Sequence, residues 1–118
     1  MTPILTLLSA LYTLSAFAAH APPPTLATYE VTAYSVGDDF TPTHGITASG
    51  ARVREGVTAA CPPELPFGTR VHIEGVGERV CLDRGGAIKG RRLDVYMTDR
   101  SEALRFGRKK ALVLVRVK

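Results

Sequence analysis

Polar and apolar residues alternate with a period of two in several short segments of the chain, which is typical of half-buried β-strands. The first such segment is 28–36, where Tyr29, Val31 and Ala33 alternate with polar neighbours. Further strands are predicted at 56–61, 69–74, 79–83, 92–97 and 111–118. Glycine and proline separate these segments, and Gly75-Val76-Gly77 predicts a hairpin between the third and fourth strands.

A short helix is predicted after the fifth strand. Asp99 is a suitable N-cap residue, Glu102 follows it within the first turn, and Gly107 is a natural C-terminal stop. Asp99 is therefore interpreted as a helix cap rather than as a catalytic residue. Six strands and one helix in roughly ninety residues predict an all-β barrel or sandwich.

The start of the chain has the composition of a leader. Residues 1–18 carry no charge, are rich in leucine and end in Ala16-Phe17-Ala18, which fits the cleavage rule of signal peptides. We predict a signal peptide, although the usual basic residues are missing. A membrane anchor is the alternative, but Thr and Ser interrupt the stretch, which is short for a membrane span. Residues 19–27 are then a proline-rich linker, and 28–118 form the folded domain.

This leader predicts an exported protein, secreted, periplasmic or associated with the cell wall, with no stable membrane insertion after cleavage. Cys61 and Cys81 then predict a disulfide bond, since two cysteines in an exported chain usually pair. Closing a loop of about twenty residues contributes about 3 kcal/mol to stability. Two buried free thiols are the alternative. Two cysteines without a clustered histidine do not make a metal site, and we expect no metal and no cofactor. His20, His44 and His72 are scattered and are interpreted as ordinary histidines.

The formal net charge is +4, with 15 Lys and Arg against 11 Asp and Glu. A basic surface attracts nucleic acid, anionic lipid or an anionic cell-wall polymer. The chain shows no pattern of a nucleic-acid-binding module, and export argues against that partner, so we expect no nucleic acid.

Two aspartates are the candidates for chemistry. Asp83 and Asp94 lie in or beside good strands, although Asp is a poor strand former. Each is expected on the face opposite its apolar neighbours, which are Val80 and Leu82 for Asp83, and Leu93, Val95 and Met97 for Asp94. They are either solvated strand residues paired with nearby arginines or a functional pair. The second reading is favoured because local sequence rules tend to fail at functional sites.

Two loops offer candidate binding groups. The connection between the aspartates contains Gly85, Gly86 and Gly90, which leave backbone accessible, and the basic residue Lys89. The segment 45–50 places small hydroxyl residues between glycines. This pattern suits a loop that approaches a ligand and equally suits a plain turn.

Four motifs occur in one order along the chain. They are Thr47-Ala48-Ser49-Gly50, Leu65-Pro66-Phe67-Gly68-Thr69, the run from Asp83 to Tyr96, and Ala103-Leu104-Arg105-Phe106-Gly107. This order resembles the three-aspartate (3D) domain family of bacterial cell-wall enzymes, which includes the catalytic part of membrane-bound lytic transglycosylase A. The resemblance covers residues 28–118. It implies a small six-stranded double-psi β-barrel with one short helix.

The resemblance also implies a function. The family cleaves the glycan strands of peptidoglycan without water and leaves 1,6-anhydro ends, with one carboxyl acting first as acid and then as base. Asp94 matches that acid/base, and Asp83 matches the second family aspartate. The expected substrate-binding residues are Thr47, Ser49, Gly85, Gly86, Lys89 and Tyr96.

The third family aspartate falls at Cys61, which suggests that its carboxylate was exchanged for a bridge to Cys81. This departure favours the alternative of a non-catalytic, expansin-like barrel that binds cell-wall glycan. A small inhibitor or a structural secreted domain is a more distant alternative.

Overall fold

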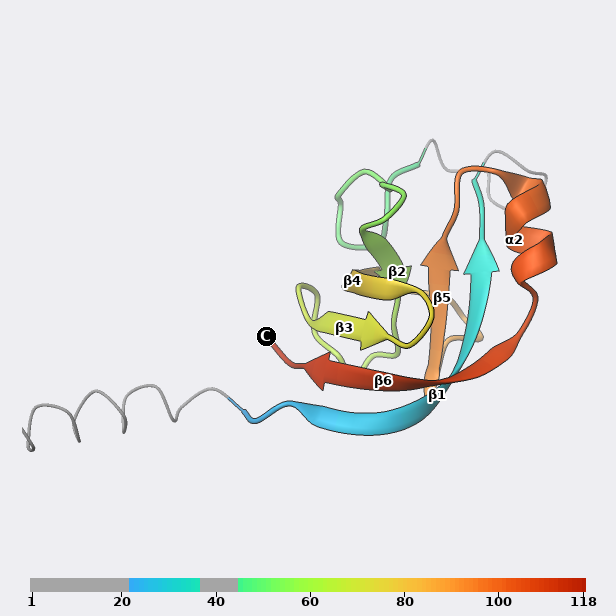
Figure 1. The fold of residues 1–118 in the computed structure, drawn as a ribbon. Helices are drawn as coiled ribbons and strands as arrows, with labels where there is room; N and C mark the ends of the chain where they lie inside the picture. The colour runs from blue at the N-terminus through green and yellow to red at the C-terminus, as the bar shows by residue number, and fades with distance from the viewer. Residues whose placement is uncertain (1–21, 37–44) are drawn as a thin grey trace, which may run out of the picture.

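The structure is a computed structural model that describes residues 22–36 and 45–118. Its elements are β1 (Thr25–Tyr34), β2 (Thr58–Ala60), β3 (Arg70–Ile73), β4 (Gly77–Asp83), β5 (Arg92–Tyr96), α2 (Arg100–Phe106) and β6 (Lys109–Arg116). The strands close into a barrel in the order β1-β5-β2-β4-β3-β6 (Figure 1). The predicted all-β barrel with one short helix is confirmed, and a sandwich is excluded. The predicted signal peptide, His20 and His44 lie outside the described residues.

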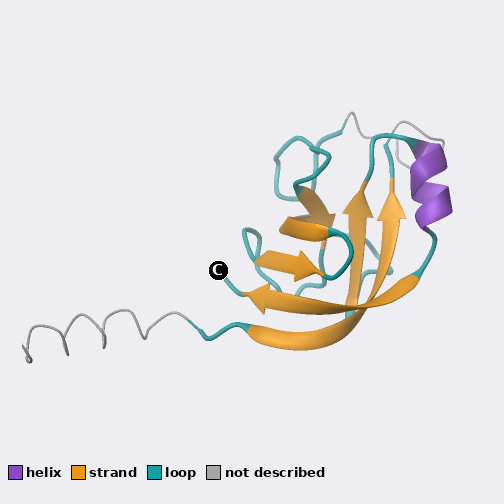
Figure 2. Cartoon of the chain, viewed as in Figure 1, coloured by secondary structure: helices purple, strands orange, loops and turns teal. Residues whose placement is uncertain are grey.

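The barrel mixes two kinds of strand pairing. β1 pairs with β5 and β2 pairs with β4 in parallel, whereas the remaining pairs are antiparallel. Strand β6 lies between β1 and β3 and pairs with both, which closes the barrel (Figure 2). Within the described residues, no helix is long and apolar enough to cross a bilayer.

Apolar side chains that alternate along the strands fill the barrel interior. The largest of these without any exposed surface are Val31, Val71, Ile73, Leu93, Val95 and Val113. Strand β1 begins at Thr25 rather than at residue 28, because Thr25 pairs with Val115 of β6. The last part of the predicted linker is therefore a strand, and Leu26, which pairs with Leu114, remains largely exposed.

The inward face of β4 differs from the prediction. The alternation assigned Val80 and Leu82 to one apolar face, but Cys81 is the fully buried residue and its two neighbours are half-buried. The physical reason is the disulfide bond, which requires Cys81 to point inward. Consecutive residues of β2 then pair with Cys81 and Asp83, so the register passes over Leu82. Such an irregularity re-aims the next side chain, and Asp83 is half-exposed instead of sharing the core with Cys81.

Helix α2 is capped at both ends as predicted. The Asp99 carboxylate accepts a hydrogen bond of 2.7 Å from the backbone N–H of Ser101. Gly107 adopts a left-handed φ of 64° and donates its N–H to the carbonyl of Ala103. Ala103 is also the buried residue of the helix, which packs against β1.

Replacing the cap tests its contribution to stability. Asp99→Ala is expected to lower the free energy of unfolding by about 1 kcal/mol, because the N–H of Ser101 loses its acceptor. Urea denaturation followed by circular dichroism measures this change. Ser101→Ala is the matched control, since only the backbone of Ser101 takes part in the bond. An unchanged midpoint for Asp99→Ala would contradict the assignment.

Candidate functional site

The two candidate catalytic aspartates lie on either side of strand β2. Ala60, at the end of β2, pairs with Asp83 of β4 on one side and with Asp94 of β5 on the other. Neighbouring strands are spaced by about 4.8 Å, so the two aspartate backbones are about 10 Å apart across a small alanine. The structure therefore brings together the pair that the sequence proposed.

Asp83 is held by three hydrogen-bond donors. Its Oδ1 accepts from the backbone N–H groups of Ala48 and Arg84, each at 2.9 Å. Its Oδ2 accepts from the hydroxyl of Tyr34 at 2.8 Å. Both oxygens are engaged as acceptors, so the carboxyl group is fixed in one orientation.

Asp94 has a different environment. Its Oδ1 accepts a hydrogen bond of 2.9 Å from the hydroxyl of Thr32, which pairs with it in the parallel β1–β5 ladder. Burial raises the pKa of the Asp94 carboxyl above its ordinary value, the hydrogen bond from Thr32 opposes this rise, and the charge of Asp83 adds to it. A carboxyl that keeps its proton to higher pH is suited to general acid catalysis.

Two tyrosines pack beside the aspartates. Tyr34 pairs with Tyr96 across β1 and β5, and their rings meet edge to face with centroids 5.6 Å apart. Burial, together with the hydrogen bond to Asp83, raises the pKa of the Tyr34 hydroxyl, which therefore stays protonated and donates. Tyr96, a predicted substrate-binding residue, is only 7% exposed, so its ring supports Tyr34.

The loop that carries Thr47 and Ser49 folds over the end of β4. The Thr47 hydroxyl lies 2.8 Å from the Ser49 hydroxyl and donates to the carbonyl of Ala51 at 2.8 Å, and Thr47 is buried. The two hydroxyl groups predicted to bind substrate are thus engaged within the loop. The group that this loop directs at the aspartates is the backbone N–H of Ala48, which contacts Asp83.

The glycine-rich connection between β4 and β5 is exposed, as are Gly85, Gly86 and Lys89 within it. Buried Ile88 anchors the connection, and its N–H donates to the carbonyl of Gly85 at 3.0 Å. A side chain at Gly85 would meet Ile88 at 3.0 Å, whereas nothing lies within 4 Å of the corresponding position at Gly86. The connection therefore offers open backbone beside Asp83, and sugar binding there remains a prediction.

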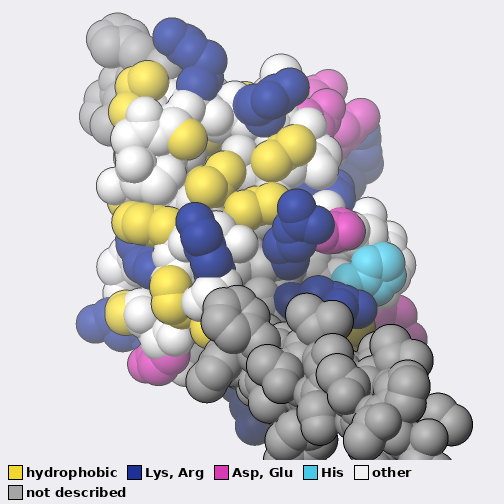
Figure 3. Space-filling model, turned by 90° about the vertical axis from the view of Figure 1, so that its left-hand side faces the viewer, with side chains coloured by type: hydrophobic (Ala, Val, Ile, Leu, Met, Phe, Trp, Pro, Cys, Tyr) yellow, Lys and Arg dark blue, Asp and Glu magenta, His cyan; other side chains and the backbone are white. Residues whose placement is uncertain are grey.

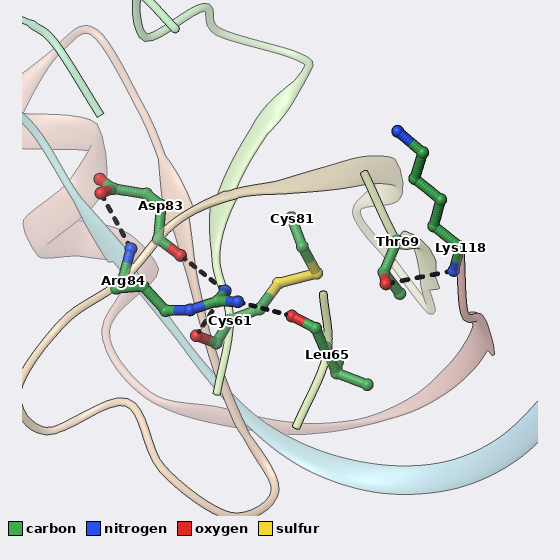
Figure 4. Close-up of a disulfide and its surroundings, with 7 residues drawn as sticks. All are labelled: Cys61, Leu65, Thr69, Cys81, Asp83, Arg84 and Lys118. Carbon is green, nitrogen blue, oxygen red and sulfur yellow. Dashed lines mark hydrogen bonds between the residues drawn. A yellow bond between two sulfur atoms is a disulfide. The ribbon is translucent and has the colours of Figure 1, made fainter. Parts of the chain in front are cut away.

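Cys61 and Cys81 form the predicted disulfide bond, and both are fully buried (Figure 4). The backbone N–H of Cys61 also donates to the carbonyl of Asp83 at 3.2 Å. In Figure 4 the Asp83 carboxylate points away from the disulfide. The disulfide bond therefore joins β4 to the residue that follows the end of β2.

Arg84 holds the segment after Cys61 against β4. Its guanidinium group donates to the carbonyl oxygens of Cys61 at 3.3 Å and of Leu65 at 2.8 Å (Figure 4). It also lies 4.2 Å from the centre of the Phe67 ring. The positive charge of Arg84 is thus directed at this segment and away from the two carboxyl groups.

The rest of the described surface has hollows but no cluster of potential metal ligands. Among residues 22–36 and 45–118, no group of three or more potential metal-binding side chains occurs. A hollow of about 310 Å³ on the outer faces of β3 and β6 is lined by Arg70, His72, Glu78, Leu114 and Arg116. Neither aspartate lines that hollow. The candidate site is therefore defined by the two aspartates and their hydrogen-bond partners rather than by a pocket. Figure 3 shows Lys and Arg side chains spread over one face of the molecule, as expected from the net charge.

Sequence reasoning missed Thr32 and Tyr34. Their partners lie 62 and 49 residues further along the chain, and the parallel pairing that places β1 beside Asp94 leaves no local mark in the sequence. The available signal was that Thr32 and Tyr34 share the polar face of the first predicted strand.

Comparison with known proteins bears on the family and the fold of the chain. Residues 57–117 match the family described as the 3D domain. Two relatives come from Bacillus subtilis strain 168. The cell wall-binding protein YocH is 37% identical over 92 residues, which are 75% of this chain and 31% of the relative. The putative cell wall shaping protein YabE is 39% identical over 69 residues, which are 55% of this chain and 17% of the relative. The chain thus spans less than a third of either relative.

Two crystal structures of MltA from Escherichia coli, described as having a unique lytic transglycosylase fold, are also similar. Their TM-scores are 0.50 and 0.51 at 23% and 22% identity, and each match covers 69% of this chain and 29% of MltA. At this level of identity the similarity establishes the fold, and the match over 57–117 establishes the family. The chain belongs to the 3D-domain family.

Proposed function

We propose that this protein is a secreted lytic transglycosylase, which cleaves peptidoglycan glycan strands with Asp94 as its single acid/base. The observation that carries this proposal is the contrast between the two carboxyl groups. Within residues 22–36 and 45–118, Asp83 has both oxygens occupied by donors, whereas Asp94 accepts one hydrogen bond, and the pKa of Asp94 is raised. Only Asp94 is free to exchange a proton with a substrate.

A reaction that needs one carboxyl group fits this arrangement. Asp94 protonates the glycosidic oxygen as the bond from that oxygen to C1 breaks. The C6 hydroxyl of the same sugar then attacks C1, and its proton returns to the Asp94 carboxylate. No water is consumed, and the products are a free hydroxyl end and a 1,6-anhydro end. Most hydrolytic glycosidases instead need two working carboxyl groups, and Asp83 is not available as the second.

The substrate and the location are supported by the relatives. YocH is named a cell wall-binding protein, YabE a putative cell wall shaping protein, and MltA shares the barrel. A disulfide bond persists in an oxidising compartment outside the cytoplasm, which fits secretion. The exposed connection of Gly85, Gly86 and Lys89 is the proposed contact for the sugar chain and its acidic peptide stems.

A second function, a cell-wall-binding barrel without catalysis, is favoured by a different observation. By the resemblance to the family, Cys61 stands at the position of the third aspartate, and its side chain is fully buried in a disulfide bond. If that third carboxylate is needed for turnover, the same surface would bind glycan and release nothing.

Incubating the purified protein with insoluble peptidoglycan separates these functions. Mass analysis of the released fragments is expected to show anhydro-muropeptides, each lighter by one water than the corresponding hydrolysis product. Fragments with reducing ends would identify a hydrolase instead. Protein that sediments with the wall but releases no fragment would establish the binding module.

A further inference from the structure

We propose that Tyr34 is a positioning residue of this site, which acts on Asp94 by fixing the direction in which the Asp83 carboxylate faces. The inference deepens the proposed function, and the expected effect of Tyr34 on cleavage rests on that function. The expected effect of Tyr34 on the two carboxyl groups does not, and it can be tested in a protein that cleaves nothing.

The Tyr34–Asp83 hydrogen bond joins two distant parts of the barrel. In the closed order β1-β5-β2-β4-β3-β6, strands β1 and β4 are separated by two strands in either direction. The 2.8 Å bond from the Tyr34 hydroxyl to Asp83 Oδ2 therefore crosses one end of the barrel. Thr32, on the same face of β1, donates to Asp94 at 2.9 Å. One strand thus supplies the side-chain donor of each aspartate.

The donors of Asp83 divide its two oxygens unequally. Oδ1 is held by two backbone N–H groups, those of Ala48 and Arg84, whereas the side chain of Tyr34 is the donor to Oδ2. Without the Tyr34 hydroxyl, the carboxyl group keeps one anchored oxygen and is free to turn the other. Tyr34 is therefore the group that sets the orientation of the carboxylate rather than its position along β4.

The charge of Asp83 acts on Asp94 without a neutralising partner. Within the described residues, none of the ion pairs includes either aspartate. The Arg84 guanidinium is turned toward the carbonyl groups of Cys61 and Leu65. Among the described residues, Tyr34 from β1 and Tyr96 from β5 are titratable groups that also lie beside the pair.

If Tyr34 orients the Asp83 carboxylate, losing its hydroxyl should change the titration of Asp94, which the loss of a purely structural hydrogen bond would leave unchanged. Tyr34→Phe keeps the ring that packs on Tyr96 and removes only the donor. Asp83 Oδ2 then loses the donor that holds it, and we expect the freed carboxylate to act less strongly on Asp94, so that the pKa of the Asp94 carboxyl falls. In a cleavage assay, the alkaline limb of the pH–rate profile moves to lower pH, and turnover at neutral pH falls about tenfold, as for the loss of a hydrogen bond to a charged group.

Carboxyl ¹³C NMR titration of the Asp94 signal measures this shift in wild-type protein, in Tyr34→Phe, in Asp83→Asn and in the double variant. Because Tyr34 is proposed to act through Asp83, the double variant should titrate like Asp83→Asn alone, without a further shift. Tyr29→Phe is the matched control, since it removes a phenol from the same strand at a core position away from the aspartates. It should leave the titration and the cleavage rate unchanged.

Three results would overturn the proposal. The first is that Asp94 titrates in Tyr34→Phe as it does in wild-type protein. The second is that the effects of the two substitutions add in the double variant. The third is that Tyr34→Phe partly unfolds while the Asp94 signal of the remaining native protein is unshifted. If wild-type protein cleaves no glycan, the proposed function fails, but the NMR comparison still decides the role of Tyr34.

Discussion

Asp94→Asn is expected to abolish cleavage of peptidoglycan while leaving binding to the insoluble wall intact. The amide keeps the shape of the side chain and can still accept the hydrogen bond from Thr32, but it has no proton to transfer. General acid catalysis typically contributes about a hundred- to ten-thousandfold, so release of anhydro-muropeptides should fall by that factor. Sedimentation with the wall and mass analysis of the supernatant measure the two properties in one experiment.

Asp83→Asn is the matched comparison for that experiment. It removes the neighbouring charge without removing the proton donor. Activity should therefore fall less than in Asp94→Asn, and the alkaline limb of the pH–rate profile should move to lower pH. If Asp94→Asn cleaves at the wild-type rate, the acid lies elsewhere and Asp83 becomes the next candidate.

The raised pKa of Asp94 also predicts how stability depends on pH. Below the ordinary Asp pKa of about 4, the carboxyl is protonated in the folded and the unfolded chain, and ionisation costs the fold nothing. As the pH rises from there through the folded-state pKa, the unfolded chain loses its proton first, so wild-type protein loses stability relative to Asp94→Asn. Thermal melts of the two proteins at acidic and neutral pH should diverge in that direction. Parallel curves would show that Asp94 has an ordinary pKa.

The elements of this fold were predictable because each leaves a local pattern. Alternation, apolar runs and the breaks at glycine and proline located the six strands, and the cap and stop residues Asp99 and Gly107 located the helix. The boundary at Thr25 was missed because three prolines dominate the preceding residues and pairing with β6 is a long-range effect. The face of β4 was missed for a similar reason, because the disulfide turns Cys81 inward, and the register shift beside it depends on β2.

The candidate site was only half predictable. Asp83 and Asp94 stand out as acids in strands, and the resemblance assigns them roles. The residues that distinguish those roles, Thr32 and Tyr34, come from a strand far away in the sequence. Thr47, a predicted binding residue, proves to be buried and bonded within its own loop. Residue type thus identified the two acids, and only the closed barrel shows how their hydrogen-bond partners differ.

Removing the disulfide bond is expected to have the largest effect on stability. The cysteines are separated by 20 residues, and closing a loop of this length restricts the unfolded chain by about 3 kcal/mol. Domains of this size have total stabilities of roughly 5–15 kcal/mol, so the loss is a large fraction. The double variant Cys61→Ala, Cys81→Ala should therefore melt roughly 12–24 °C below wild-type protein. Alanine is the suitable replacement because both positions are fully buried and a hydroxyl there would need a partner.

The same variant tests whether the disulfide bond contributes to activity as well as to stability. Arg84 binds the carbonyl oxygens of Cys61 and Leu65 through backbone atoms, which the substitution to alanine leaves in place. The donors of Asp83 are likewise unaffected, so at temperatures well below its melting point the variant should cleave at a rate close to that of wild-type protein. Calorimetry with and without a reductant provides the control, because reductant should lower the melting temperature of wild-type protein but not of the variant. Equal melting temperatures in the absence of reductant would mean that the bond does not stabilise the barrel. A loss of activity in the fully folded variant would instead mean that the disulfide orients Asp83, in addition to restricting the unfolded chain.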